Sequence, residues 1–428
     1  MATENRNYNK TSGRKNTKVI IAVLILLVLV VSCGGFILWY LSKDSRDDAG
    51  EKRLFPAKET QTITVGSVGD VIIHDPFLRS DRYKKSDGYD FTDCFKFTAD
   101  LYEKQDYMVA NLETTLAGKS AGYSGYPLFN SPDAIADALH ESGIDMMLLA
   151  NNHIYDTGKS GFQRTAKVLD EKGYSHTGVR GDTGEAKYAV KDINGIKVGF
   201  INYTYETPAS NGKAINGNKM DNASAQLLNS FKPKNLQPFY DEAIRQVALM
   251  KLAGAEFIIF YPHWGQEYKL EAHGYMNKMA QKMCDMGVDA IIGGHPHVVE
   301  PVDVVKSSDG KHKTFVAYSM GNHLSNQRRE MITSMPTGHT EDGIMVNLEI
   351  SRDASGEVKL TNVETVPTWV YKKKGANAVY YVIPLNDVDN IENVTGISGI
   401  KESCKASNKR THEIIDSGMK KVKQEYGF

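Results

Sequence analysis

Residues 290–302 read AIIGGHPHVVEPV and are the most informative stretch of the chain. A short apolar run ends in two glycines, and the triplet His295-Pro296-His297 follows where the run stops. Short apolar runs that end in glycine or proline are typical of buried strands. The stretch therefore predicts a buried strand whose end carries a pair of histidines.

The same arrangement, an apolar run that ends in polar residues, recurs elsewhere in the 428-residue chain. The polar residues at these ends are Asp70; Asn111 and Glu113; Asn151, Asn152 and His153; and His263. Helix-type stretches at 132–142, 161–172, 238–253 and 275–286 lie between the runs, and glycines follow them. Alternating strands and helices predict an α/β layered domain, in which sites form at strand ends.

Imidazoles and carboxylates together suit divalent transition ions. The candidates are Asp70, Glu113, Asn152, His153, His263, His295 and His297. Seven groups are enough for two ions that share a bridging carboxylate, and two ions about 3.5–4 Å apart can activate a water. In an extended segment His295 and His297 would point the same way, and Gly293 and Gly294 would let the chain pass close to an ion.

Each candidate alone has an ordinary explanation. A single histidine at a strand end is more often packed in the core, and Asn152 could be a helix cap. His74, four residues after Asp70, is as much a loop residue as a further ligand. The remaining histidines, apart from His323, which is taken up with its motif below, are expected on surfaces or helices: His140, His176, His273, His312, His339 and His412. The combination in chain order is stronger evidence than any member.

The N-terminal part of the chain predicts a membrane anchor. Residues 19–41 form a run of 23 residues without a charge, enough to span a bilayer with some tilt. Residues 1–18 carry a net charge of +4, which places the N-terminus in the cytoplasm and the rest outside. A lipoprotein signal ending at Cys33 and a cleaved signal are the alternatives. We expect a linker at 42–60, the main domain at 61–366 and an extension at 367–428.

Composition excludes some classes of protein. The net charge is −1, so binding to nucleic acid by bulk charge is not expected. Cys94, Cys284 and Cys404 are too few and too far apart for a disulfide scaffold and are expected to be buried as small hydrophobes. Residues 204–235 predict a long loop near the site, and 410–426 predict a helix only weakly.

The motifs together resemble a known family. The strings GD (ending at 70), NLE (111–113), ANNHxxDxG (150–158), HWGxEY (263–268), GGHPHVVEPV (293–302) and YSMGN (318–322) resemble the CapA family of poly-γ-glutamate capsule biosynthesis proteins. That family is similar to calcineurin-like metallophosphatases. The resemblance implies a four-layer α-β-β-α sandwich after one transmembrane helix.

The resemblance also implies roles for individual residues. Metal ligands would be Asp70, Glu113, Asn152, His263, His295 and His297, with two ions of Mn, Fe or Zn. His153 would be catalytic, stabilising charge or protonating a leaving oxygen. Substrate would contact Asn111, Asn151, Trp264, Glu267, Tyr268 and Asn322. The chain departs from the superfamily at Ile72, where the first motif usually has histidine, at Glu113, where it has aspartate, and at His323, whose place after Asn322 is of uncertain meaning.

Three hypotheses follow for function. The first is a membrane-anchored extracellular metalloprotein that serves synthesis, export or attachment of poly-γ-glutamate or a similar anionic envelope polymer, with other membrane subunits as partners. The second is a metal-dependent hydrolase of a phosphoester or amide, in which His153 aids the leaving group. The third is a non-enzymatic assembly subunit with a degenerate site.

Overall fold

The computed structural model describes residues 60–428 apart from 374 and 376, and these belong to one compact unit. The predicted cytoplasmic tail (1–18), the anchor (19–41) and residues 42–59 of the linker lie outside the described residues. Within residues 60–428, no described helix is both long enough and apolar enough to cross a membrane.

The first large sheet has the strand order β19-β18-β17-β1-β4-β5-β6, with β16 beside the end of β1. Strands β1, β4, β5 and β6 are parallel, whereas β17, β18 and β19 add to the other side of β1 in antiparallel fashion. The bounds are β1 (Gln61–Val71), β4 (Tyr107–Leu112), β5 (Met146–Leu148), β6 (Ser175–Thr177), β16 (Asn322–Leu324), β17 (Asp342–Arg352), β18 (Val358–Lys373) and β19 (Val379–Pro384).

The second large sheet has the order β11-β8-β12-β13-β15-β14, with β7 beside β8. Strands β8, β12, β13 and β15 are parallel, and β7 and β14 are antiparallel to their neighbours. The bounds are β7 (Ala189–Ile193), β8 (Ile196–Tyr205), β11 (Ser230–Phe231), β12 (Phe257–His263), β13 (Ala290–Ile292), β14 (Val302–Lys306) and β15 (Lys313–Ala317).

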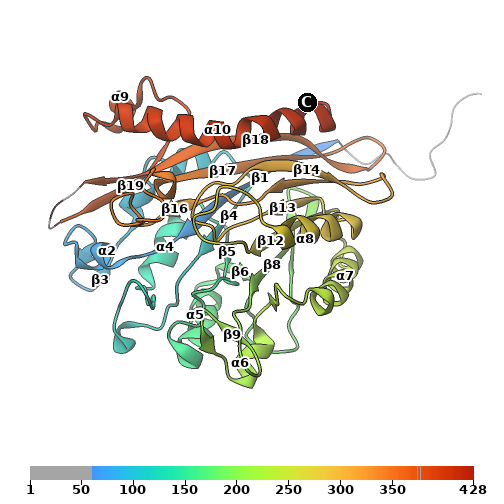
Figure 1. Cartoon of the computed structure of the whole chain (residues 1–428), viewed down its shortest axis with the longest axis horizontal. Coiled ribbons are helices and arrows are strands. Elements are labelled where there is room, and N and C mark those ends of the chain that lie inside the picture. The colour runs from blue at the N-terminus through green and yellow to red at the C-terminus, as the bar shows by residue number, and fades with distance from the viewer. Residues whose placement is uncertain (1–59, 374, 376) are drawn as a thin grey trace, which may run out of the picture. The chain divides into compact units, whose positions relative to one another are not determined.

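The two sheets pack face to face, and helices cover their outer faces (Figure 1). Val65, Val109, Phe200 and Ile259 belong to the core between the sheets. Helices α4 (Ala134–Glu141) and α5 (Gly158–Lys172) contribute to a second core on the first sheet, and α7 (Gln237–Leu252) and α8 (Gly274–Asp285) to a third on the second sheet. The predicted α/β class is confirmed.

The boundary predicted at residue 366 is wrong. Strand β18 runs through it to Lys373, so the chain continues within the same sheet. Helix α10 (Lys401–Tyr426) then packs against β18 and β14, one strand from each sheet (Figure 1). Its Ile415 and Val422 are buried in the core between the sheets. Residues 367–428 therefore complete the domain instead of extending it.

Residues 204–235 are not one long loop. They contain the end of β8, a small hairpin of β9 (Ala214–Ile215) and β10 (Asn218–Lys219), helix α6 (Asn222–Leu227) and β11. Asn216, in the hairpin turn, lies 3.5 Å from the ring of His153 (Nδ2 to Nδ1), so the segment does border the site.

Short elements complete the described part of the chain. They are α2 (Asp75–Arg79), β2 (Lys84–Lys85), β3 (Gly88–Tyr89), α3 (Ala99–Tyr102), α9 (Ile391–Thr395) and three 3-10 turns at Thr92–Phe95, Lys119–Ala121 and His339–Glu341. Cys94, Cys284 and Cys404 are buried and free, as predicted.

Candidate metal centre

The polar residues singled out by the sequence follow the carboxyl ends of parallel strands in both sheets. Asp70 lies near the end of β1, Glu113 follows β4, and Asn152 and His153 follow β5. From the second sheet, His263 ends β12, and His295 and His297 follow β13. Because parallel strands end at one edge of a sheet, these side chains meet at a common edge of the sandwich.

Two groups of potential metal ligands share one carboxylate. Glu113 forms a group with His263 and His295, and a second group with Asp70 and His297; within each group the ligand atoms lie within 4.8 Å of one another. Oε1 of Glu113 is 3.7 Å from Nε2 of His263 and 3.7 Å from Nε2 of His297. The geometry brings together two groups of potential metal ligands around a shared Glu113.

Asn152 joins the first of these groups. Its Oδ1 atom lies 2.7 Å from Nε2 of His263. An amide oxygen at this distance could accept a hydrogen bond from the imidazole or turn its lone pairs to an ion. All six residues predicted as ligands are therefore in one cluster.

Two buried atoms of the cluster have no hydrogen-bond partner among the described residues: Oε1 of Glu113 and Nδ1 of His295. A buried polar atom without a partner is unfavourable unless something satisfies it. Burial and then the charge of Asp70 raise the pKa of Glu113 well above its usual range. Burial and then neighbouring histidines lower the pKa of His263 and His295 well below theirs. Neutral imidazoles around a buried carboxyl fit a divalent ion.

Asp70 is held in place by several donors. Nδ2 of Asn111 donates to its Oδ1 at 2.7 Å, and the backbone N–H of His295 donates to its Oδ2 at 3.2 Å. Nδ1 of His297 lies 3.1 Å from the same Oδ2. Burial acts to lower the pKa of His297, but the hydrogen bond and charge of Asp70 outweigh it and raise that pKa.

The expectation that His295 and His297 lie in an extended segment is wrong. Both have positive φ angles, 98° and 57°, in a bend around Pro296. The ring centroids are 5.7 Å apart, and of the two groups that share Glu113, one contains His295 and the other His297. Gly294 is needed here because a Cβ atom would lie 2.8 Å from Oδ1 of Asp70.

His153 stands beside the ligand groups and not within them. Its Nδ1 atom lies 2.7 Å from Oδ2 of Asp156, and that oxygen also accepts the backbone N–H of Phe129 at 2.8 Å. The contact orients the imidazole and leaves its other ring nitrogen, Nε2, available to a substrate. Asp156 belongs to the same ANNHxxDxG motif as His153, although the motif alone does not indicate its role.

Two of the predicted substrate residues lie behind the ligands. Besides its bond to Asp70, Nδ2 of Asn111 donates to Oε2 of Glu113 at 3.2 Å. Nδ2 of Asn151 donates to Oδ1 of Asn111 at 3.2 Å and to the Leu112 carbonyl at 2.8 Å. Both asparagines are buried, and their hydrogen bonds position the carboxylates; that they also bind substrate stays a prediction.

Trp264 and Asn322 are also positioning residues. Trp264 is fully buried in the core under α8, and its Nε1 donates to the Tyr318 carbonyl at 2.8 Å. Nδ2 of Asn322 donates to the carbonyl of His297 at 3.2 Å and to that of Thr340 at 2.9 Å. Their donors are bound by the protein, whereas Oδ1 of Asn322 has no hydrogen-bond partner among the described residues, and the substrate contacts of both residues stay predictions.

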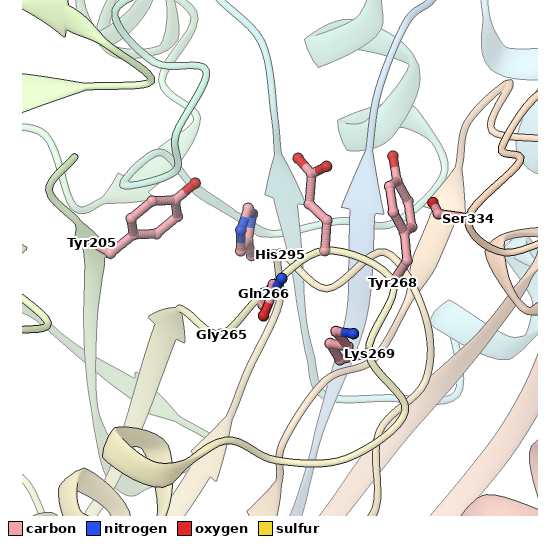
Figure 2. Close-up of a pocket in the computed structure, with 8 residues that line it drawn as sticks. Tyr205, Gly265, Gln266, Tyr268, Lys269, His295 and Ser334 are labelled. Atoms are coloured by element: carbon pink, nitrogen blue, oxygen red, sulfur yellow. The ribbon is translucent and has the colours of Figure 1, made fainter. Parts of the chain in front are cut away.

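Glu267 and Tyr268 line the space in front of the ligands, and their contact with substrate stays a prediction. One cavity of about 510 Å³ is lined by Glu267 and Tyr268, together with Tyr205, His295, Lys269 and Ser334. Figure 2 shows His295 between Tyr205 and Tyr268, and the Tyr205 and His295 ring centroids are 4.7 Å apart. A second cavity of about 370 Å³ shares Glu267 and Tyr268 and reaches His153, His297 and the apolar Ile72, Phe129 and Met331.

The two histidines of uncertain role are both packed into the protein. Nδ1 of His74 accepts the backbone N–H of Asn326 at 3.2 Å, and burial lowers its pKa to about 3. His74 belongs to none of the ligand groups found among the described residues. His323 is buried against Phe95 and hydrogen-bonds the hydroxyl of Tyr102.

The fold and this cluster are those of an α/β protein with a candidate metal centre. Comparison with known protein families shows which family the chain belongs to. The chain belongs to the family described as "Bacterial capsule synthesis protein PGA_cap", whose profile matches residues 64–327. It is 24% identical to "Capsule biosynthesis protein CapA" of Bacillus anthracis, over 74% of this chain and 71% of that protein. It is 22% identical to "PGA biosynthesis protein CapA" of Bacillus subtilis, over 71% of each chain. The predicted family is confirmed.

Among solved structures, the chain is similar to the NAD nucleotidase NadN of Haemophilus influenzae. The TM-score is 0.43 at 13% sequence identity, over 86% of this chain and 68% of that chain.

Proposed function

We propose that this chain is a metal-dependent hydrolase of capsule biosynthesis that acts on a phosphoester or amide bond in an anionic envelope polymer or its precursor. The observation that carries the proposal is the position of Glu113, shared by two ligand groups beside the His153–Asp156 pair. Membership of the capsule-synthesis family supports capsule biosynthesis as the process. We propose poly-γ-glutamate or a similar polymer as the polymer involved.

The described residues divide into two ligand sets. Asp70, Glu113 and His297 would hold one ion, and Glu113, Asn152, His263 and His295 the other. Ions of Mn, Fe or Zn suit this mixture of carboxylate, amide and imidazole. When bound, a pair of such ions supplies Lewis acidity and lowers the pKa of a coordinated water. The metallophosphatase-like arrangement inside a four-layer sandwich is part of this proposal.

His153 is proposed to handle the proton of the leaving group. Asp156 accepts from Nδ1, so Nε2 is the nitrogen that can deliver a proton toward the 370 Å³ cavity that His153 lines. An oriented imidazole of this kind typically contributes about 10²- to 10⁴-fold to rate. The two cavities meet at Glu267 and Tyr268, so a substrate can extend to both sides of the ligand groups.

We also propose a location and partners. Residues 19–41 anchor the chain in the cell membrane with the N-terminus in the cytoplasm and the folded domain outside. The uncharged run of 23 residues and the net charge of +4 before it support this topology. The partners proposed are the anionic polymer and other membrane subunits of a synthesis or export complex.

The first experiment measures metal content and turnover on the full chain purified in detergent. About two transition ions per chain, with hydrolysis of an aryl phosphodiester or a γ-glutamyl amide that falls on His153→Ala while the metal stays bound, would support the proposal. His176→Ala is the control, because His176 pairs with Asp170 outside the cluster. Two bound ions without turnover on either substrate class would contradict the hydrolase.

One observation favours a second candidate, a non-enzymatic assembly subunit. Ile72 stands where the superfamily that this chain resembles carries a histidine. The Asp70 group therefore has three protein ligands among the described residues. Loss of surface polymer in a deletion strain that is restored equally by wild-type and His153→Ala chains would favour this candidate over the hydrolase.

A further inference from the structure

Glu267 lies on the loop that follows β12, with an exposed side chain. One of its carboxylate oxygens forms a group with a ring nitrogen of His295 and one of His297, all within 4.8 Å of one another. His295 and His297 belong to the two different ligand groups that share Glu113. The Glu267 carboxylate therefore reaches both groups from the side of the cavities that it lines.

The Asp70 group has room for another ligand, and the nearest alternatives do not supply it. The backbone N–H of Ile72 donates to the Leu324 carbonyl at 2.7 Å, and its hydrocarbon side chain lines the 370 Å³ cavity. His74 lines the same cavity, but it belongs to none of the ligand groups found among the described residues. In the part of the chain that the structure describes, Glu267 is the remaining carboxylate grouped with His297.

We propose that Glu267 is a metal ligand that joins the two ion sites on their solvent side. The inference rests on the proposed two-metal centre and adds a ligand to it. Asp70 and Glu113 are the carboxylates of the two ligand groups that share Glu113, and Glu267 adds a third carboxylate on the side of the cavities. Carboxylate oxygens are good ligands for Zn²⁺ and Mn²⁺.

The alternative role of Glu267 is the one expected from the sequence, a contact with substrate. The two roles predict different effects of replacing Glu267 on metal binding. A ligand affects the binding of the ion in the absence of any substrate, whereas a substrate contact leaves ion binding unchanged. Because the side chain is exposed, its replacement does not disturb the core.

The test is a calorimetric titration of Mn²⁺, and separately of Zn²⁺, into the chelator-treated full chain in detergent, without substrate. Glu267→Gln keeps the size of the side chain and removes its charge. We expect at least one of the two binding steps to weaken by about tenfold or more, since even residues behind the ligands alter affinity by about 10- to 100-fold. Glu271→Gln, a change of the same type at an exposed position of the same loop, should titrate as wild type.

Two outcomes would overturn the inference, and they are distinguishable. If wild type binds two ions, Asp70→Asn loses binding and Glu267→Gln titrates as wild type, Glu267 is not a ligand and the proposed function is untouched. If wild type itself binds neither Mn²⁺ nor Zn²⁺, the metal centre fails and the inference fails with it.

Discussion

The Nδ1 atom of His153 lies 2.7 Å from Oδ2 of Asp156, and both side chains are buried next to the ligand groups. Asp156 thus selects the tautomer and the orientation of the imidazole at the edge of the cavity. The pair is separate from the residues that would hold metal, so proton transfer and metal binding can be tested independently.

Asp156→Asn should lower turnover and leave metal content unchanged. The amide carries no negative charge, so it no longer favours the doubly protonated imidazolium that must give up a proton from Nε2. We expect a loss within the range of about 10²- to 10⁴-fold that general acid catalysis contributes. The measurements are turnover and metal per chain. Asp170→Asn, which alters an Asp–His pair with His176 outside the cluster, is the control; a variant that loses metal would contradict the separation of roles.

Glu113→Gln should remove both ions, because Glu113 belongs to both ligand groups. His263→Ala touches one group and should remove about one ion. Metal per chain, measured by mass spectrometry after gel filtration, distinguishes these results. Equal losses in the two variants would show that Glu113 is not shared.

Gly418→Ala should destabilise the domain. Gly418 lies in α10 where it meets β14, and a Cβ atom there would lie 1.8 Å from the carbonyl oxygen of Val302. The helix must move away from the sheet, and such overpacking typically costs about 1–3 kcal/mol in the free energy of unfolding. Urea unfolding measures it. Gly274→Ala, in α8, has open space around the added Cβ and should not destabilise; equal effects of both changes would refute the packing argument.

Glu300 should make stability depend on pH. Neither carboxyl oxygen of this buried residue has a hydrogen-bond partner among the described residues, and burial raises its pKa to about 8. The folded state therefore keeps a proton that the unfolded chain releases near pH 4.5. The stabilising effect is complete below about pH 4.5 and is lost as the pH rises through 8, by about 1.4 kcal/mol per pH unit at most.

The comparison that checks this is urea unfolding of wild type and Glu300→Gln at several values between pH 5 and 9. The amide is neutral throughout, so the variant should gain stability relative to wild type as pH rises. Glu271→Gln, at an exposed position, should follow wild type. Parallel profiles for wild type and Glu300→Gln would show that the buried carboxyl does not titrate in this range.

Most strands and the ligand cluster were predictable because both leave a local pattern in the sequence. An apolar run that stops at Asp70 or His263 marks the end of a buried strand, and parallel strands bring their ends together. The direction of a side chain leaves no such pattern. Trp264 follows His263 in sequence but is buried in the core, and Asn111 donates to the carboxylates of Asp70 and Glu113.

The C-terminal region was predicted poorly for a physical reason. The buried face of α10 includes Ser407 and Thr411, so its hydrophobic period is weak. Ser407 is buried because its hydroxyl donates to Asp342 at 2.6 Å, and Arg410 binds the same carboxylate. A helix attached by polar contacts to a strand more than 60 residues earlier cannot be recognised from local hydrophobicity.

The position of α10 also determines when this protein can fold. Strand β1 starts the described fold, yet its antiparallel neighbour β17 begins at Asp342, and the interior between the sheets is completed by Val422. Contacts between segments so distant in sequence form late, since a long loop must close first. A nascent chain therefore cannot close its core before α10 has been made, and shortened products that lack α10 should be substrates for proteolysis.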